Sequence, residues 1–165
     1  MITLHTPDVL STKAVAASLA KLAVSGDLII LSGDMGVGKT AFAQGFAVGL
    51  DITEPVTSPT FTLVRSYPVA AKIGRPRVMH HLDVYRLDRT SEVADLAIDE
   101  LLDDRSVTLI EWGEAVLGML PKNRLEITLD YGDETNDRTI GIDAVGASWQ
   151  PRLARLHELW EAWSC

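Results

Sequence analysis

The sequence predicts a mixed α/β fold in which a mainly parallel central sheet carries helices on its faces and antiparallel hairpin strands beside it. Apolar runs at residues 28–31 and 107–110 are typical of central parallel strands, which are buried on both faces. A glycine-rich loop and a helix-forming segment follow the first run, as in a strand–loop–helix unit. Strand-like pairs joined by turn-rich segments supply the hairpins.

The first half of the chain alternates predicted strands and helices. Ser11 or Thr12 is expected to cap the first helix. In the second helix, Gly45 and Gly49 either weaken the helix or let it pack closely on the sheet, and the sequence leaves both roles open. The elements expected here are a strand at 2–4, a helix to about residue 24, a strand at 28–31, a helix at 40–50 and a strand at 61–67.

The second half is predicted to begin with a returning strand and to end with an amphipathic helix. Leu153, Leu156 and Trp160 recur at helical spacing near the end of the chain, and we expect this apolar stripe to pack into the core. The elements expected here are a hairpin connection at 70–76, a strand at 78–85, two short helical pieces at 91–103, strands at 107–110, 125–129 and 138–142, and the helix at 148–163.

Composition narrows the class of protein. The chain has 165 residues, about the length of one domain, and 47% of them are hydrophobic. A net charge of −8 disfavours a broad electrostatic grip on nucleic acid, because phosphates are contacted by clustered Lys and Arg. If RNA is involved, we expect another protein to hold it. The single cysteine, Cys165, allows neither an intrachain disulfide nor a multi-cysteine metal site.

The hydrophobic runs are short and interrupted by charges, so no membrane-spanning segment is expected. Residues 1–5 also lack the charged-then-apolar pattern of an export signal. These two features predict a cytoplasmic protein.

The strongest motif follows the strand at 28–31. It fits the pattern G-x-x-x-x-G-K-[ST] and consists of Gly33, Asp34, Met35, Gly36, Val37, Gly38, Lys39 and Thr40. The glycines let the backbone wrap so that its N–H groups point at phosphate oxygens. Lys39 places a positive charge near the β- and γ-phosphates, and Thr40 offers a hydroxyl to Mg²⁺. The motif predicts a phosphate-binding P-loop with ATP or ADP and Mg²⁺ as ligands.

Carboxylates follow two later strands. Glu111 comes directly after the strand at 107–110, where a P-loop protein needs an acid to reach Mg²⁺ or to orient water, and position alone leaves both roles open. Asp83 shares one face of its strand with His81 and Tyr85, and we expect it to support the metal or to activate water. His81 and Tyr85 either orient that chemistry or belong to an exposed strand face.

The hydroxyl-rich loop at residues 57–61 follows the first helix of the P-loop unit. Switch-like segments in this place contact the γ-phosphate or the metal in P-loop ATPases, although Ser-Pro-Thr is also ordinary loop sequence and means little alone.

Four ordered motifs together give a family resemblance. The P-loop, residues 57–64, residues 81–87 and residues 110–114 resemble the TsaE (YjeE) family, and the likeness runs from about residue 2 to 142. The resemblance implies a P-loop NTPase-like three-layer sandwich. We expect residues 1–147 to form a single ATPase domain, and we expect residues 148–165, which the family motifs do not cover, to form an amphipathic helix packed on it. The resemblance also implies an ATPase that acts with the TsaD and TsaB proteins when threonylcarbamoyladenosine is made at position 37 of tRNAs reading codons that begin with A.

The resemblance further assigns roles to matching positions. Lys39 and its neighbours through Ala41 would bind phosphates, while Thr40, Glu111 and Asp83 would serve the metal. Trp112 would be important for activity near the site, Arg138 would lie near the nucleotide, and residues 7–10 would touch the base. Two residues depart from the family pattern, since Ala41 stands where a second hydroxyl is common and Ala97 where glycine is frequent.

Other functions compete with the ATPase. The same P-loop and carboxylates serve small-molecule or nucleoside kinases, although no Arg-rich lid is evident here. A nucleotide-gated binding module, in which hydrolysis is incidental, is a further alternative. A guanine-specific switch is disfavoured because the chain has no Asn-Lys-x-Asp motif.

Overall fold

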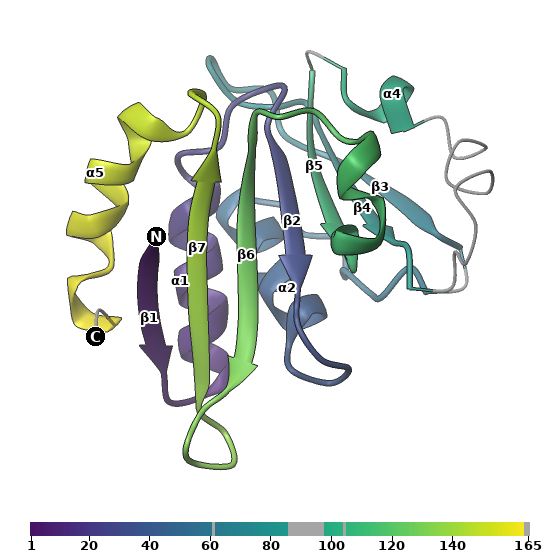
Figure 1. Cartoon of the computed structure of the whole chain (residues 1–165). Helices are drawn as coiled ribbons and strands as arrows, with labels where there is room; N and C mark the ends of the chain where they lie inside the picture. Colours follow the sequence, from purple (N-terminus) through teal and green to yellow (C-terminus); the bar gives the residue numbers. More distant parts are fainter. Residues whose placement is uncertain (61, 86–97, 104, 164–165) are drawn as a thin grey trace.

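The computed structural model describes residues 1–60, 62–85, 98–103 and 105–163. Within them, seven strands form one sheet in the order β1-β7-β6-β2-β5-β4-β3 (Figure 1). The strands are β1 (Ile2–Thr6), β2 (Leu28–Ser32), β3 (Val64–Pro68), β4 (Val78–Asp83), β5 (Ser106–Glu111), β6 (Arg124–Tyr131) and β7 (Arg138–Val145).

The middle of the sheet is parallel and its margins are antiparallel. Strand β2 pairs in parallel with β5 and β6, and β5 pairs in parallel with β4. At the margins β3 runs antiparallel to β4, and β7 runs antiparallel to both β6 and β1. Strands β2, β4 and β5 therefore end at one edge of the sheet, which is where open α/β sheets place their ligands.

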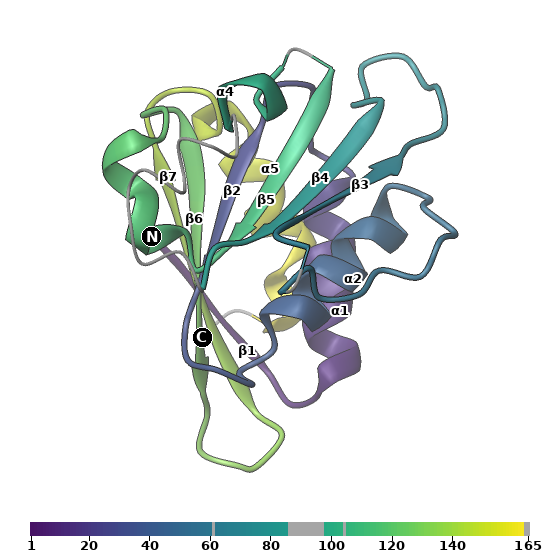
Figure 2. The same cartoon turned by 90° about the vertical axis from the view of Figure 1, so that its right-hand side faces the viewer.

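Helices lie on both faces of the sheet, as Figure 2 shows in side view. Helices α1 (Val9–Ala20) and α2 (Lys39–Gly49) cover one face, while α4 (Ile98–Leu101) and the 3₁₀ helix η1 (Gly113–Met119) lie on the other. Helix α5 (Gln150–Leu159) and the 3₁₀ helix η2 (Glu161–Trp163) follow β7. The three layers and the mixed sheet confirm the predicted fold class.

The core is divided by the sheet. Side chains alternate along β2, so that Ile29 and Leu31 join the cluster beneath α1 and α2, whereas Leu28 and Ile30 face η1. The C-terminal helix belongs to the larger cluster, because Trp149, Leu156 and Trp160 are fully buried there. The Nε1–H of Trp160 also donates to Ser18 Oγ on α1 at 2.6 Å.

The two glycines of α2 settle the question left by the sequence. A Cβ at Gly45 would lie 2.4 Å from the carbonyl oxygen of Lys13, and one at Gly49 would lie 2.3 Å from that of Ala17. Both contacts are on α1, so the glycines permit close packing between the two helices rather than packing on the sheet.

Several predicted boundaries were wrong. Asp8, not Ser11 or Thr12, caps α1, since its side chain accepts from Ser11 N at 2.7 Å. The helix also ends at Ala20, well before residue 24. Strand β3 begins at Val64, β4 ends at Asp83, β7 runs on to Val145, and η1 was not predicted.

Part of the remaining predictions falls on residues that the structure does not describe. Phe61, at the start of the predicted strand, and Ala97, together with the rest of residues 91–97, lie outside the described residues. Of the two helical pieces predicted at 91–103, α4 is the one that the described residues contain. Among the described residues, no helix is both long and apolar enough to cross a membrane.

Candidate functional site

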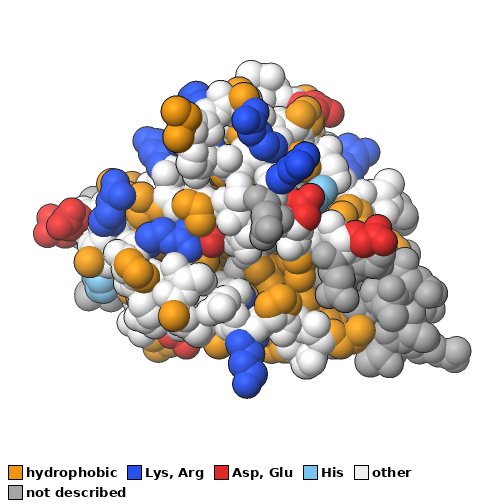
Figure 3. Space-filling view, turned by 90° about the horizontal axis from the view of Figure 1, so that it is seen from above, with side chains coloured by type: hydrophobic (Ala, Val, Ile, Leu, Met, Phe, Trp, Pro, Cys, Tyr) orange, Lys and Arg blue, Asp and Glu red, His pale blue; other side chains and the backbone are white. Residues whose placement is uncertain are grey.

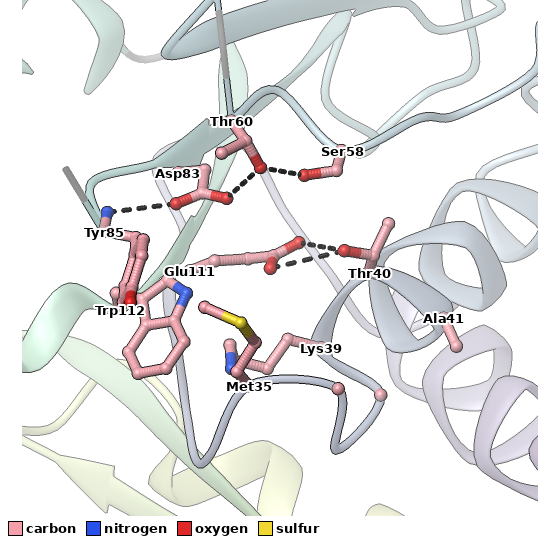
Figure 4. A pocket seen from close by; sticks show the side chains of 12 residues that line it. Met35, Lys39, Thr40, Ala41, Ser58, Thr60, Asp83, Tyr85, Glu111 and Trp112 are labelled. Atoms are coloured by element: carbon pink, nitrogen blue, oxygen red, sulfur yellow. Dashed lines mark hydrogen bonds between the residues drawn. The ribbon is translucent and has the colours of Figure 1, made fainter.

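A cavity of about 440 Å³ opens at the edge where β2, β4 and β5 end (Figure 4). The P-loop, the first turn of α2 and the ends of β4 and β5 form its walls. Its lining residues are Met35, Gly36, Gly38, Lys39, Thr40, Ala41, Ser58, Thr60, Asp83, Tyr85, Glu111 and Trp112.

The P-loop needs its glycines for two physical reasons. The φ angles of Gly33, Gly36 and Gly38 are 130°, 78° and 120°, a region that side chains with a Cβ rarely adopt. In addition, a Cβ at Gly33 would lie 2.2 Å from the carbonyl oxygen of Leu129 on β6. The loop therefore keeps its wrapped shape only with glycine at these positions, and Gly38 passes directly into α2.

Lys39 is folded back onto the loop. Its Nζ donates hydrogen bonds to the carbonyl oxygens of Gly33 at 2.7 Å and Asp34 at 2.8 Å. The same ammonium lies 3.7 Å from the centre of the Trp112 ring, within the range of a cation–π contact. Lys39 is 4% exposed, so its charge is stabilised by loop dipoles and an aromatic face instead of by bulk water.

Thr40 and Glu111 meet across the cavity. The Thr40 hydroxyl donates to Glu111 Oε1 at 3.0 Å, and the fully buried His81 places its Nε2 2.8 Å from the same oxygen. Glu111 is itself only 3% exposed. The P-loop hydroxyl and the acid at the end of β5, predicted separately as metal ligands, are thus brought into direct contact.

Asp83 lies beside Glu111, because the two residues are partners in the parallel pairing of β4 and β5. Asp83 Oδ2 accepts from the Thr60 hydroxyl at 2.9 Å, and Oδ1 accepts from the backbone N–H of Tyr85 at 3.0 Å. Ser58 is hydrogen-bonded to Thr60 in turn. The hydroxyl-rich loop is therefore attached to the carboxylate side of the cavity.

Trp112 adopts an unusual backbone conformation where β5 ends. Its φ of 62° lies in the left-handed region, which is uncommon for a residue with a large side chain. The conformation sets its ring between Lys39 and the ring of Tyr85, whose centroid is 4.7 Å away. No sequence pattern predicted the Lys39–Trp112 contact, because it joins two segments that meet only in the folded sheet.

A second cavity of about 390 Å³ lies on the other side of the P-loop, between the start of α1 and the β6–β7 hairpin. Arg138 borders it and donates from Nε to the carbonyl oxygen of Val37 at 2.7 Å. Ala41 lines both cavities. The other lining residues are Asp8, Val9, Thr12, Gly36, Val37, Gly38 and Asn136.

The oxygen donors in the cavity suit a hard cation that takes some of its ligands from the protein and others from a phosphate. Among the described residues no group of three or more His, Cys, Asp or Glu side chains could hold a metal by itself. A hydroxyl from Thr40 and carboxylates from Glu111 and Asp83 are oxygen donors of the kind that Mg²⁺ prefers, and Mg²⁺ typically takes one or two carboxylates with phosphates and water.

Comparison with known proteins agrees with this geometry. A family model described as "Threonylcarbamoyl adenosine biosynthesis protein TsaE" matches residues 6–140. The chain belongs to the TsaE family. Each candidate site residue from Gly33 to Arg138 lies within the matched segment of the TsaE model.

TsaE relatives match over most of their length. The chain is 40% identical to the tRNA threonylcarbamoyladenosine biosynthesis protein TsaE of Bacillus subtilis over 84% of this chain and 83% of the relative. It is 38% identical to the protein of that name from Streptomyces coelicolor, over 79% and 88% of the two chains. The crystal structure of YdiB from Bacillus subtilis superposes with a TM-score of 0.74 at 33% identity, covering 98% of this chain and 97% of that one.

Proposed function

We propose that this chain is the ATP-binding and ATP-hydrolysing component of the cytoplasmic machinery that makes threonylcarbamoyladenosine in tRNA. Membership of the TsaE family and the names of its relatives support the pathway. The contact between Thr40 and Glu111 at 3.0 Å inside the P-loop cavity carries the chemical part of the proposal, because it joins the two oxygen donors that phosphoryl chemistry requires around Mg²⁺.

Roles follow from the positions of the side chains. The P-loop amides and Lys39 bind the phosphates, and the start of α2 adds partial positive charge. Thr40 and Glu111 would hold Mg²⁺, and Asp83 beside them would support the metal or the attacking water. A bound Mg²⁺ neutralises charge that develops on the phosphates. Trp112 covers Lys39 and limits its access to water.

The second cavity is the proposed site of the ribose and base of the nucleotide. It adjoins the P-loop at Gly36 and Gly38 and is bordered by Arg138 and by Val9 at the start of α1. This arrangement supports the expectation that Arg138 and residues 7–10 lie near the ribose and base. The family's pathway also implies partner proteins, and we propose TsaD and TsaB for this chain.

Glu111→Gln tests the assigned chemistry. We expect it to retain binding of ADP and ATP, since the phosphates are held by the P-loop, but to lower hydrolysis on the order of 100-fold because the acidic group near the reacting phosphate is lost. Calorimetry gives the affinity, and phosphate release gives the rate. Glu158→Gln on the exposed side of α5 is the matched control. Unchanged hydrolysis in Glu111→Gln would contradict the assignment.

The pathway is tested by measuring phosphate release from ATP with and without a TsaD–TsaB pair. Hydrolysis that depends on the pair is the expected result. Rapid transfer of the γ-phosphoryl group to a small acceptor, independent of the pair, would overturn the proposal in favour of a kinase. Partner binding that needs nucleotide but survives in Glu111→Gln, with the modification reaction intact, would favour the nucleotide-gated module.

A further inference from the structure

His81 is a buried polar residue to which the proposed function assigns no step. It sits on β4, its side chain has no exposed surface, and its Nε2 lies 2.8 Å from Glu111 Oε1. In the strand pairing His81 is opposite Leu109, so its ring reaches forward along the sheet to the carboxylate at the end of β5. A buried polar side chain of this kind calls for a physical reason.

The contact with Glu111 determines that Nε2 of the His81 ring carries a hydrogen. An ionised carboxylate can only accept, so Nε2 carries the proton. Within the described residues Nδ1 of His81 has no hydrogen-bond partner. The hydrogen bond from Nε2 to Glu111 is therefore the polar contact that the His81 ring makes within the described chain.

Glu111 accepts hydrogen bonds from Thr40 and His81, and of these two only Thr40 is also a proposed metal ligand. The Thr40 hydroxyl donates to Oε1 at 3.0 Å and approaches Oε2 at 3.4 Å. The proposed function gives that hydroxyl to Mg²⁺, whereas His81 lies behind the carboxylate in the core and has no such second role. If the Thr40 hydroxyl binds the metal, His81 is the described side chain whose hydrogen bond to Oε1 remains, and that bond does not involve Oε2.

We propose that His81 is a positioning residue that sets the orientation of the Glu111 carboxylate for Mg²⁺ and water. The inference rests on the proposed function, because it concerns the same metal and the same acid. His81 acts through Glu111 and does not touch the nucleotide. Partners of this kind typically contribute 10- to 100-fold to metal affinity or activity.

Two substitutions separate the hydrogen bond from the packing. His81→Gln keeps an N–H that can reach the place of Nε2, whereas His81→Leu fills a similar space without a donor. We expect the Mg²⁺ concentration needed for tight ADP binding to rise about 10- to 100-fold in His81→Leu and to stay near the wild-type value in His81→Gln. ADP binding measured in EDTA should be the same in both variants and in the wild type. Calorimetry supplies these values without reference to hydrolysis.

His80 is the matched control. It is the neighbouring histidine on β4, its side chain alternates to the other face, and its Nδ1 is hydrogen-bonded to Ser66 at 2.8 Å. His80→Leu should leave the Mg²⁺ dependence unchanged. An unchanged Mg²⁺ dependence in His81→Leu, or an equal loss in His81→Gln and His81→Leu, would overturn the proposal. Wild-type protein without Mg²⁺-dependent nucleotide binding would instead overturn the proposed function.

A measurement on the wild-type protein does not depend on whether a variant folds. Long-range ¹H–¹⁵N NMR distinguishes the two nitrogens of each histidine ring, and the signals lost in His81→Gln, or those left after assignment of the other three histidines, belong to His81. We expect a proton on Nε2, the nitrogen that faces Glu111. A ring protonated at Nδ1 and bare at Nε2 could not donate to Glu111 and would overturn the proposal.

Discussion

At the scale of single residues, the ammonium group of Lys39 is already hydrogen-bonded within the P-loop, and these bonds must break before it can bind a phosphate. Its hydrogen bonds to Gly33 and Asp34 brace the loop from within, and the Trp112 ring lies against the ammonium. Phosphate oxygens would replace the two carbonyls as stronger, charged acceptors. The same side chain thus braces the loop in this structure and would contact the phosphates once a nucleotide is bound.

Lys39→Met should weaken binding of Mg²⁺–ADP by about 10- to 100-fold, because a hydrogen bond to a charged group contributes about 1.5–3 kcal/mol. Calorimetric titration measures the change. Lys122→Met, an exposed lysine in the η1–β6 connection, is the control and should bind like the wild type. Equal affinity in Lys39→Met and the control would show that Lys39 does not contact phosphate.

The sequence predicted individual site residues better than their contacts. Lys39 and Thr40 follow from a motif whose spacing fixes their place on the loop, and Glu111 follows from its position after a buried strand. The Thr40–Glu111 hydrogen bond joins residues that are 71 positions apart, so it depends on β2 and β5 being neighbours. The left-handed backbone of Trp112 also has no local signal, because glycine or asparagine is the usual residue in that conformation.

At the scale of elements, the α1–α2 contact depends on missing side chains. The carbonyl oxygens of Lys13 and Ala17 on α1 occupy the space where Cβ atoms at Gly45 and Gly49 would lie. Since α2 begins at the P-loop, this close packing also helps to fix where Lys39 and Thr40 lie, and Thr40 contacts Glu111 at the end of β5. The glycines therefore contribute to the site through the position of a whole helix.

Gly45→Ala should destabilise the protein by about 1–3 kcal/mol, because overpacking at a backbone contact outweighs the gain in helix propensity of about 1 kcal/mol. Urea denaturation measures the change in the free energy of unfolding. Gly118→Ala is the matched control, since a Cβ at Gly118 has open space around it. A Gly45→Ala variant as stable as the wild type would show that α1 and α2 separate at little cost.

The errors in predicted elements have physical causes. Asp8 was overlooked as a cap even though it stands three residues before Ser11, the spacing at which a side chain can reach a backbone N–H of the first turn. The 3₁₀ helix η1 is short and its geometry gives no 3.6-residue periodicity, so no apolar pattern indicated it. The central strands were found because burial on both faces makes them continuously apolar.

At the scale of the whole molecule, α5 is tied to the sheet by an ion pair at the end opposite the P-loop. Arg152 donates from Nη1 and Nη2 to the two Asp27 carboxylate oxygens at 2.6 and 2.7 Å, and its guanidinium lies 3.6 Å from the Trp149 ring centre. The side chain of Asp27 is only 4% exposed. The turn before β2 and the C-terminal helix are therefore one packed unit.

Arg152→Met should lower the free energy of unfolding by about 3–5 kcal/mol, because it leaves the buried Asp27 carboxylate without its counter-charge. Chemical denaturation followed by circular dichroism measures the loss. Arg155→Met, an exposed arginine on the same helix, should change stability little. Equal stability of the two variants would show that the ion pair contributes nothing net to folding.

The surface at that end carries side chains of both charges (Figure 3). Figure 3 looks onto it from above, and the Lys and Arg side chains are dispersed among hydrophobic and acidic ones instead of forming one continuous basic area. The expectation that a partner holds any RNA remains a prediction.

The order of strands has a consequence for synthesis on the ribosome. The P-loop follows β2, yet both neighbours of β2 in the sheet, β5 and β6, are translated much later. In the same way, β1 pairs with β7, which is translated near the end. The P-loop thus leaves the exit tunnel before the strand that bears Glu111 exists. The first strand, β1, stays unpaired until β7, the last of the described strands, has been made. Such non-local pairing is slow to form. A growing chain that still lacks β5 cannot bring Thr40 and Glu111 together, so the P-loop cavity takes its shape only late in translation.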